Sequence, residues 1–175
     1  VIPPTYVYAE AERHAADLLK ELCAGSPYRF QRVSLPAKLL AVRSGLAEYG
    51  RNNICYSAEF GSFQRVLTFC SDMPIDADDW REMTLAERCG HCGACVKSCP
   101  SGAIAENRFV IHAERCITYR NETEYPFPDW LDSGMHNALI GCMKCQTVCP
   151  MDKEHLKKET DRIVFSEDET HQILN

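Results

Sequence analysis

The sequence predicts an α+β protein built in two parts, and two observations support that prediction. The first 83 of the 175 residues contain three cysteines and mix helical with strand-like patterns. Residues 84–151 instead contain eight of the eleven cysteines and few large apolar side chains, and residues 152–175 form a polar C-terminal tail. Apolar residues make up 45% of the chain, which is enough for a packed core and argues against wholesale disorder.

The first part opens with a helix and a strand in its sequence pattern. Apolar residues recur at helical spacing over residues 10–24, and Gly25 is a natural stop for that helix. Residues 28–33 then alternate apolar with polar side chains, which is typical of a half-buried strand.

A second helix and two further strands follow. Ser34 is a suitable cap and Pro36 a suitable first-turn residue, and we expect this helix to continue to Gly50. Residues 54–57 and 65–71 resemble two strands joined by a turn, and an acidic linker then leads to the cysteine-rich part. Three short strands are too few for a free-standing sheet with covered faces.

Charge and hydropathy exclude two broad classes of partner. Nineteen Lys and Arg against 25 Asp and Glu give a net charge of −6, which disfavours general nucleic-acid binding, although a local basic patch could survive. No stretch reaches the roughly 18 uncharged apolar residues of a membrane span. The chain begins at Val1 without a Met or a signal-peptide pattern, which leads to two alternatives: an N-terminal part has been removed, or residues 1–83 pack against a partner.

The spacing of the cysteines indicates metal ligands instead of disulfides. Their number is odd, and the crowded ones lie two or three residues apart, where a disulfide has poor geometry. Thiolates that hold metal need a reducing compartment, so we expect a cytoplasmic protein.

The first cysteine motif has the spacing of a bacterial ferredoxin. It runs Cys89-Gly-His-Cys92-Gly-Ala-Cys95-Val-Lys-Ser-Cys99-Pro100, which is C-x₂-C-x₂-C-x₃-C-P. In that arrangement the first three thiolates bind one [4Fe–4S] cluster, and the fourth binds the other cluster.

The second motif repeats this pattern imperfectly. It runs Cys142-Met-Lys-Cys145-Gln-Thr-Val-Cys149-Pro150 and lacks one upstream cysteine, for which Cys116 is the candidate. Pseudo-twofold symmetry then assigns each of the eight cysteines once. The first cluster takes Cys89, Cys92, Cys95 and Cys149, and the second takes Cys99, Cys116, Cys142 and Cys145.

The competing interpretation is a pair of Cys₄ zinc sites. Zinc favours paired C-x₂-C knuckles and has no use for a third cysteine at the same spacing or for two C-P endings, so two [4Fe–4S] clusters are the stronger prediction. We interpret the three remaining cysteines as buried structural thiols. The aromatic side chains of residues 117–141 are expected to cover a cluster or to pack on residues 1–83.

Several stretches beyond the cysteine motifs resemble one known family. They are Ala41-Val-Arg-Ser-Gly45-Leu-Ala-Glu-Tyr-Gly50-Arg-Asn-Asn-Ile-Cys-Tyr, Glu59-Phe-Gly61-Ser62, Leu67-Thr-Phe-Cys-Ser-Asp72, Cys99-Pro-Ser-Gly-Ala-Ile104, Arg115-Cys-Ile-Thr-Tyr119 and Gly141-Cys-Met-Lys-Cys-Gln146. Over residues 30–152 this resembles epoxyqueuosine reductases and the related reductive-dehalogenase-like proteins with a C-terminal double [4Fe–4S] ferredoxin domain.

The resemblance implies more than the spacing does. In that family an α/β domain holds cobalamin beside the clusters, so residues 1–83 are expected to be a partial cobalamin-type domain that lacks its first half. The resemblance places Tyr49, Arg51, Asn52 and Asn53 near the corrinoid. One departure concerns the substrate. The family's epoxyqueuosine-reducing members carry an acidic proton donor before the second helix, where this chain has Gln31 and no Asp or Glu from residue 22 to 47.

These observations lead to an iron–sulfur redox protein that relays single electrons, with a corrinoid as the expected acceptor. It would be an oxidoreductase if the natural chain includes a complete corrinoid domain; the catalytic residues stay unknown. The alternatives are a ferredoxin-like electron carrier or accessory subunit, and a structural cluster or zinc module. The expected partner is a redox protein or a donor of flavodoxin or ferredoxin type, and a homo-oligomer is left open.

Overall fold

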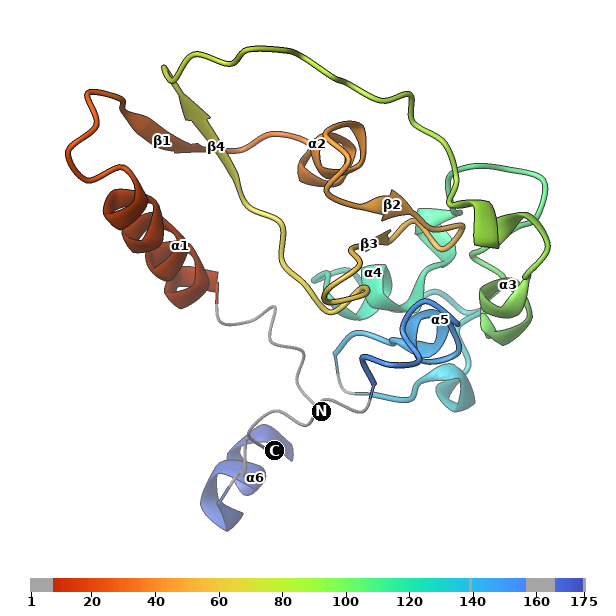
Figure 1. The fold of residues 1–175 in the computed structure, drawn as a ribbon. Helices are drawn as coiled ribbons and strands as arrows, with labels where there is room; N and C mark the ends of the chain where they lie inside the picture. Colours follow the sequence, from red (N-terminus) through yellow and green to blue (C-terminus); the bar gives the residue numbers. More distant parts are fainter. Residues whose placement is uncertain (1–7, 139, 157–165, 175) are drawn as a thin grey trace.

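The computed structural model describes residues 8–138, 140–156 and 166–174. Over these residues it is a mixed arrangement of helices and two small antiparallel sheets (Figure 1). This confirms the predicted mixture of helix and sheet. None of the helices in the described residues is long and apolar enough to cross a membrane.

The first helix and strand are confirmed, with small shifts at their ends. Helix α1 spans Tyr8–Leu22, and strand β1 spans Phe30–Val33. β1 pairs antiparallel with β4, Thr68–Ser71, to form a two-stranded ribbon beside α1 (Figure 1). An ion pair between Arg32 and Glu12 (Nη2 to Oε1, 3.2 Å) joins the ribbon to the helix.

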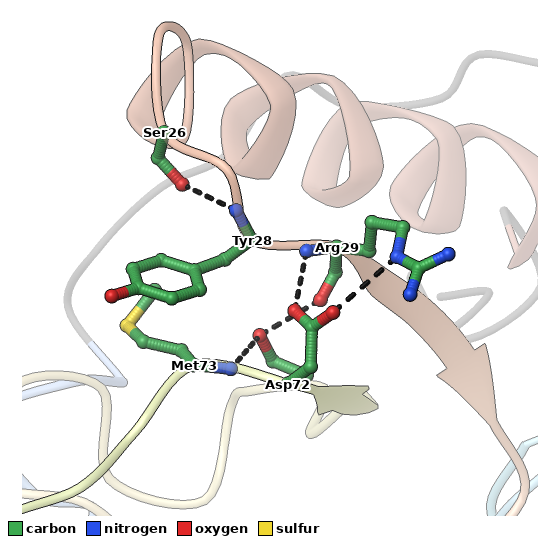
Figure 2. A network of polar contacts seen from close by, with 6 residues as sticks. Ser26, Tyr28, Arg29, Asp72 and Met73 are labelled. Atoms are coloured by element: carbon green, nitrogen blue, oxygen red, sulfur yellow. Dashed lines mark hydrogen bonds and ion pairs between the residues drawn. The ribbon is translucent and has the colours of Figure 1, made fainter.

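A polar network closes the far end of this ribbon (Figure 2). The backbone N–H of Arg29 donates to Oδ1 of Asp72 (2.6 Å), and this bond holds the pKa of that carboxyl below its usual value. The Ser71 hydroxyl donates to the Arg29 carbonyl (2.8 Å) and accepts from the Met73 N–H (3.1 Å). These bonds fix the register in which β1 and β4 pair.

The second helix is shorter than predicted. Helix α2 spans Ala37–Arg43 and ends well before Gly50. Gly45 adopts a φ of +80°, and the N–H of Ala47 donates back to the Ala41 carbonyl (3.1 Å). The sequence after α2 therefore turns into strand β2, Glu48–Tyr49, instead of continuing the helix.

The predicted pairing of the next two strands is wrong. Strand β3 spans Cys55–Tyr56 and pairs antiparallel with β2, while β4 pairs with β1. The reason is the tight turn at residues 50–54, in which the Gly50 N–H donates to the Ile54 carbonyl (2.8 Å) and folds β3 onto the preceding strand.

The acidic linker returns along α2 to the second sheet (Figure 1). The Arg81 N–H donates to the Arg43 carbonyl (2.7 Å), and the Arg43 guanidinium lies over the Trp80 ring, 5.4 Å from its centroid. The Ala86 N–H then donates to the Tyr49 carbonyl (2.8 Å), which brings the chain to the cysteine-rich part beside β2.

The cysteine-rich part is built from short helices and loops. Its elements are the 3-10 helix η2 (Glu87–Gly90), α3 (Ala94–Ser98), η3 (Ala113–Arg115), α4 (Ile117–Asn121), η4 (Ser133–Met135) and α5 (Lys144–Thr147), and α6 (Glu167–Leu174) follows in the tail. Helix α3 packs against α5.

One small core joins the two parts of the chain. Its buried members lie on α2 and on the adjoining sheet: Ala41, Val42, Ala47, Tyr49 and Cys55. Phe109, from the cysteine-rich part, packs against this core with its ring 5.2 Å from that of Tyr49. The turn between β2 and β3 is therefore held close to the cysteines.

Candidate metal centre

Four of the cysteines line one cavity between the two parts of the chain. Its lining includes Cys89, Cys92, Cys95 and Cys149, together with residues of the β2–β3 turn and Tyr56. Cys92 is exposed, so this ring of thiols borders solvent on one side. These are the four cysteines that the spacing groups together, and we call them the Cys149 ring.

The other four line a second cavity. Its lining includes Cys99, Cys116, Cys142 and Cys145, and we call these four the Cys99 ring. The second cavity is the more spacious, about 210 Å³ against about 20 Å³ for the first. Asn52 lies in the wall of both cavities, so the two rings are neighbours.

The crossing between the rings follows from the two short helices. Cys95 lies on α3 and Cys99 just after its end, while Cys145 lies on α5 and Cys149 just after its end. Helix α3 packs against α5. The segment after α3 therefore brings Cys99 to the cavity lined by Cys145, and the segment after α5 brings Cys149 to the cavity lined by Cys95. Cys116 joins the Cys99 ring from the segment between η3 and α4, in the place that the second motif leaves open.

Both loops enter their helices through the same backbone conformation. Gly93 precedes α3 with a φ of +64°, and Met143 precedes α5 with a φ of +53°. This left-handed conformation turns the chain sharply between two cysteines of each motif. Gly93 adopts it without strain, whereas Met143 is a non-glycine residue held in a strained conformation at the candidate site.

Burial raises the pKa of four of these thiols. It raises the pKa of Cys145 to about 12, although a hydrogen bond from the Asn52 side chain acts in the opposite direction. Burial also raises the pKa of Cys95, Cys142 and Cys149. A buried thiol that is hard to ionise becomes a thiolate when a positive metal centre replaces its proton.

Cys99 has the opposite shift. Burial opposes its ionisation, but hydrogen bonds from the Ser101 side chain and from nearby backbone N–H groups outweigh that effect and lower the pKa of Cys99. The Ala103 N–H donates to its sulfur at 3.3 Å. The loop after α3 is thus already arranged to stabilise negative charge on this sulfur.

In the part of the chain that the structure describes, no three His, Cys, Asp or Glu side chains are grouped so as to hold one metal ion. The eight thiols instead surround two cavities. Eight cysteine sulfurs in two sets of four are the donor set of two [4Fe–4S] clusters, so the residues present fit that cofactor.

Asn52 and Tyr56 both line the cavity of the Cys149 ring, and Asn52 also lines that of the Cys99 ring. Both are buried, with 4% and 2% of their surface exposed. The Asn52 Nδ2 donates to the Tyr56 hydroxyl (2.6 Å) and lies 3.5 Å from the Cys145 carbonyl. Tyr56 lines the same cavity as Cys149, and burial raises the pKa of its hydroxyl.

The other residues predicted to lie near a corrinoid make contacts within the chain. Arg51 donates to the carbonyls of Glu106 (2.7 Å) and Cys89 (3.1 Å), beside the Cys149 ring. The hydroxyl of buried Tyr49 donates to the Asn53 side chain, and Asn53 has a φ of +63°. Contact of these residues with a corrinoid stays a prediction, and their observed position is the turn that adjoins the cysteines.

A buried carboxylate was missed because it lies in the polar tail. Asp152 is 0% exposed and accepts from the Ser62 N–H (2.7 Å) and hydroxyl (2.6 Å). Gln146 on α5 donates to the same hydroxyl (2.8 Å). Gly61 has a φ of +58°, and a Cβ there would lie 2.3 Å from Oδ1 of Asp152. The contact between Asp152 and Ser62 therefore needs glycine at position 61. This glycine is the one feature of the sequence that points to the buried carboxylate.

Other predicted features lie away from the rings or differ from expectation. Gln31 is exposed on β1 and pairs with Cys70, which is also exposed and therefore not a buried structural thiol. Of the aromatics in the insertion, Tyr119, Tyr125 and Phe127 are exposed instead of packed on residues 1–83. Among its described residues, the stretch 117–141 contains the short helices α4 and η4 and no strand.

Comparison with known proteins identifies the cysteine-rich part. Residues 88–152 match the family of 4Fe–4S double cluster binding domains. The chain is 28% identical to the epoxyqueuosine reductase of Bacillus subtilis over 152 residues, which is 83% of this chain and 38% of the relative. It is 32% identical to the Escherichia coli epoxyqueuosine reductase over 140 residues, 78% of this chain and 36% of the relative.

Solved structures give the same result. A Bacillus subtilis epoxyqueuosine reductase, captured with its catalytic loop swung out of the active site, matches with a TM-score of 0.70 and 30% identity over 83% of this chain and 39% of its own. A Streptococcus thermophilus epoxyqueuosine reductase at 19% identity shares the fold, with a TM-score of 0.68 over 96% of this chain and 44% of its own. The predicted resemblance is confirmed, and the chain spans less than two fifths of the length of the first two curated relatives.

One comparison does not fit the prediction against nucleic-acid binding. A further epoxyqueuosine reductase, with a TM-score of 0.70 and 29% identity over 83% of this chain and 39% of its own, was solved with an epoxyqueuosine-modified tRNA-Tyr stem loop. Net charge is a sum over the whole surface, so a chain of −6 can still resemble a protein that was solved with an RNA stem loop.

Proposed function

We propose, because the chain is homologous to epoxyqueuosine reductases, that it carries one [4Fe–4S] cluster on each cysteine ring and relays single electrons toward a corrinoid. The arrangement of four cysteines around each of two neighbouring cavities is the observation that carries this proposal. The match of residues 88–152 to double-cluster domains supports it independently.

The residues of this chain have distinct tasks in such a relay. The clusters supply one-electron chemistry at low potential. The cysteines of the two rings would hold them in place. Arg51 ties the β2–β3 turn to the carbonyl of Cys89, and Asn52 lies in both cavity walls, so the same turn fixes the distance between the rings.

Anaerobic purification should yield about eight irons and about eight acid-labile sulfides per chain, because each ring offers a full set of four thiolates. The protein should show a broad visible absorbance that dithionite bleaches. Iron and sulfide analysis together with absorption spectroscopy measures both. A colourless protein with stoichiometric zinc would contradict the proposal and support the zinc alternative.

The corrinoid step depends on a region beyond this chain. Relatives are more than twice as long as the matched segment, and half a pocket offers too little surface to offset the lost freedom of a bound ligand. We therefore expect this 175-residue chain to bind cobalamin weakly or not at all. A chain extended at its N-terminus to the length of the relatives should bind it tightly.

Titration of both chains with cobalamin, followed by absorption spectroscopy, measures this difference. Tight binding by the shorter chain would show that residues 1–83 form a complete site. If the extended chain also fails to bind, the electron-carrier alternative takes over.

The identity of the reduced substrate is a separate matter. The relatives reduce epoxyqueuosine by name, and the Bacillus subtilis structure has an aspartate on its catalytic loop. This chain has no acidic residue from 22 to 47, and Gln31 is exposed on β1. We infer that reductive chemistry on a different substrate fits these residues better than epoxyqueuosine reduction does.

A further inference from the structure

The two cysteine motifs differ in charge at one equivalent position. Ala94 is the first residue of α3 and precedes Cys95, while Lys144 is the first residue of α5 and precedes Cys145. Each follows a residue in the left-handed conformation, so the two positions correspond in backbone as well as in sequence. Ala94 lines the cavity of the Cys149 ring, and Lys144 lines that of the Cys99 ring. One ring therefore has a cation where the other has a methyl group.

A second lysine reaches the Cys99-ring cavity from the first part of the chain. Lys38 on α2 lines this cavity, and its ammonium group donates to the Asn53 carbonyl (2.8 Å). Asn53 belongs to the same cavity wall. The ammonium nitrogen also lies 6.0 Å from the centre of the Tyr49 ring, which gives the cation a second contact. These contacts hold the charge of a flexible side chain beside the cavity.

The balance of charge differs between the two cavities. The Cys99-ring cavity has Lys38 and Lys144 in its wall, and none of the described residues that line it is Asp or Glu. Apart from the cysteines, Arg51 is the one charged residue among the described residues that line the Cys149-ring cavity. A carboxylate lies close to that cavity, because a Cβ on Gly93 in its wall would be 3.5 Å from Oε1 of Glu106. The excess of positive charge is therefore at the Cys99 ring.

Resting on the proposed function, we propose that Lys144 and Lys38 give the Cys99-ring cluster the higher reduction potential, so that the first electron settles on it. Reduction adds one negative charge to a cluster, and a nearby cation stabilises the reduced form more than the oxidised form. Lys144 is half-buried, so solvent screens its charge less than that of an exposed lysine. Since Cys92 of the other ring is exposed, this order directs electrons from the surface toward the larger cavity.

Lys144→Ala tests the proposal by giving the second motif the residue that the first motif has. In an EPR-monitored redox titration of the cluster-loaded chain, the step of the Cys99-ring cluster should move to lower potential, and the other step should stay in place. With Lys38→Gln added, we expect about a tenfold change in the oxidised-to-reduced ratio of that cluster at a fixed applied potential, which corresponds to about 59 mV for one electron. A Cys149→Ala sample, which retains the Cys99-ring cluster, identifies its step.

Two further variants separate the effect of charge from a general structural effect. Ala94→Lys moves the cation to the other ring, so it should raise the step of the Cys149-ring cluster and leave the Cys99-ring step in place. Combined with Lys144→Ala, it should reverse the order in which the two clusters accept the first electron. Lys97→Ala is the matched control, because this exposed lysine lies between Cys95 and Cys99 but lines neither cavity, and both steps should stay in place.

The unmodified protein provides a readout that needs no lysine substitution. Reduction by one electron per chain should give mainly the EPR signal that the Cys149→Ala sample shows. A first electron on the Cys149-ring cluster, or a Cys99-ring step that neither lysine variant moves, would overturn the inference while the proposed function stands. A protein that assembles no clusters would overturn the proposed function itself.

Discussion

In a Cys149→Ala variant we expect the cluster held by Cys89, Cys92 and Cys95 to be lost or degraded, while the Cys99-ring cluster stays intact. Cys149 follows Cys145 by four residues, yet it lines the opposite cavity, so its loss leaves the distant ring with three thiolates. Iron content should fall from about eight toward about four per chain. Iron analysis and the EPR spectrum of the reduced protein measure the change.

The matched variant is Cys99→Ala, because Cys99 occupies the equivalent position after α3 and lines the other cavity. It should damage the cluster held by Cys116, Cys142 and Cys145 and leave the first one intact. Cys70→Ala is the control, since this exposed thiol lines neither ring cavity and should retain full iron. Damage by Cys149→Ala to the cluster that contains Cys142 would refute the crossed arrangement.

The grouping of the cysteines could be predicted because spacing constrains it strongly. Cysteines separated by two residues lie in one loop and bind the same cluster. The cysteine of the C-P ending follows a short helix and binds the other cluster. The structure gathers the same two sets of four around its cavities. Even distant Cys116 was accessible, because each motif needs a fourth partner and only one cysteine was left within the region.

Features that depend on tertiary contacts were less accessible. Helix α2 ends early because Gly45 reverses the chain, although the apolar pattern continues to Leu46. The pairing of β4 with β1 depends on the network around Asp72, which lies far along the chain from its partner Arg29. Local patterns contain no information on such pairings.

Asp152 shows the same limit at the candidate site. A charged residue in a polar tail is read as solvated, since Asp is rarely buried without partners. Here the partners are supplied by Ser62, 90 positions earlier, and by its contact with Gln146. Only the folded chain reveals that the residue following Met151 is part of the interior.

Asp152→Ala is expected to be the most destabilising single substitution outside the cysteines. It removes both acceptors of the Ser62 N–H and hydroxyl and leaves these donors buried without that partner. Each of the two buried donors that loses its partner costs about 1–3 kcal/mol. Against a typical stability of about 5–15 kcal/mol, this is a large fraction of the free energy of unfolding.

The loss should also act on one cluster more than the other. Asp152 lies three residues after Cys149, and its carboxylate accepts from the Ser62 N–H (2.7 Å) and hydroxyl (2.6 Å), so it anchors the segment that brings this thiol to its ring. Without that anchor, the Cys149-ring cluster should be lost to an iron chelator faster than the Cys99-ring cluster. Denaturant unfolding of the loaded protein measures the stability, and EPR during chelation measures the two losses separately.

Graded variants show whether the Ser62 contact is the cause. Ser62→Ala keeps the bond from the Ser62 N–H to Asp152, so it should reduce the free energy of unfolding less than Asp152→Ala does. Asp152→Asn keeps the shape of the side chain but turns one acceptor into a donor that faces the Ser62 donors. Its loss of stability should lie between those of the other two variants. Combining Ser62→Ala with Asp152→Ala should cost less than the sum of the single effects, since both remove one contact. Asp129→Ala, an exposed carboxylate, should have little effect. Equal, small effects for all variants would mean that the buried carboxylate does not hold the Cys149 segment in place.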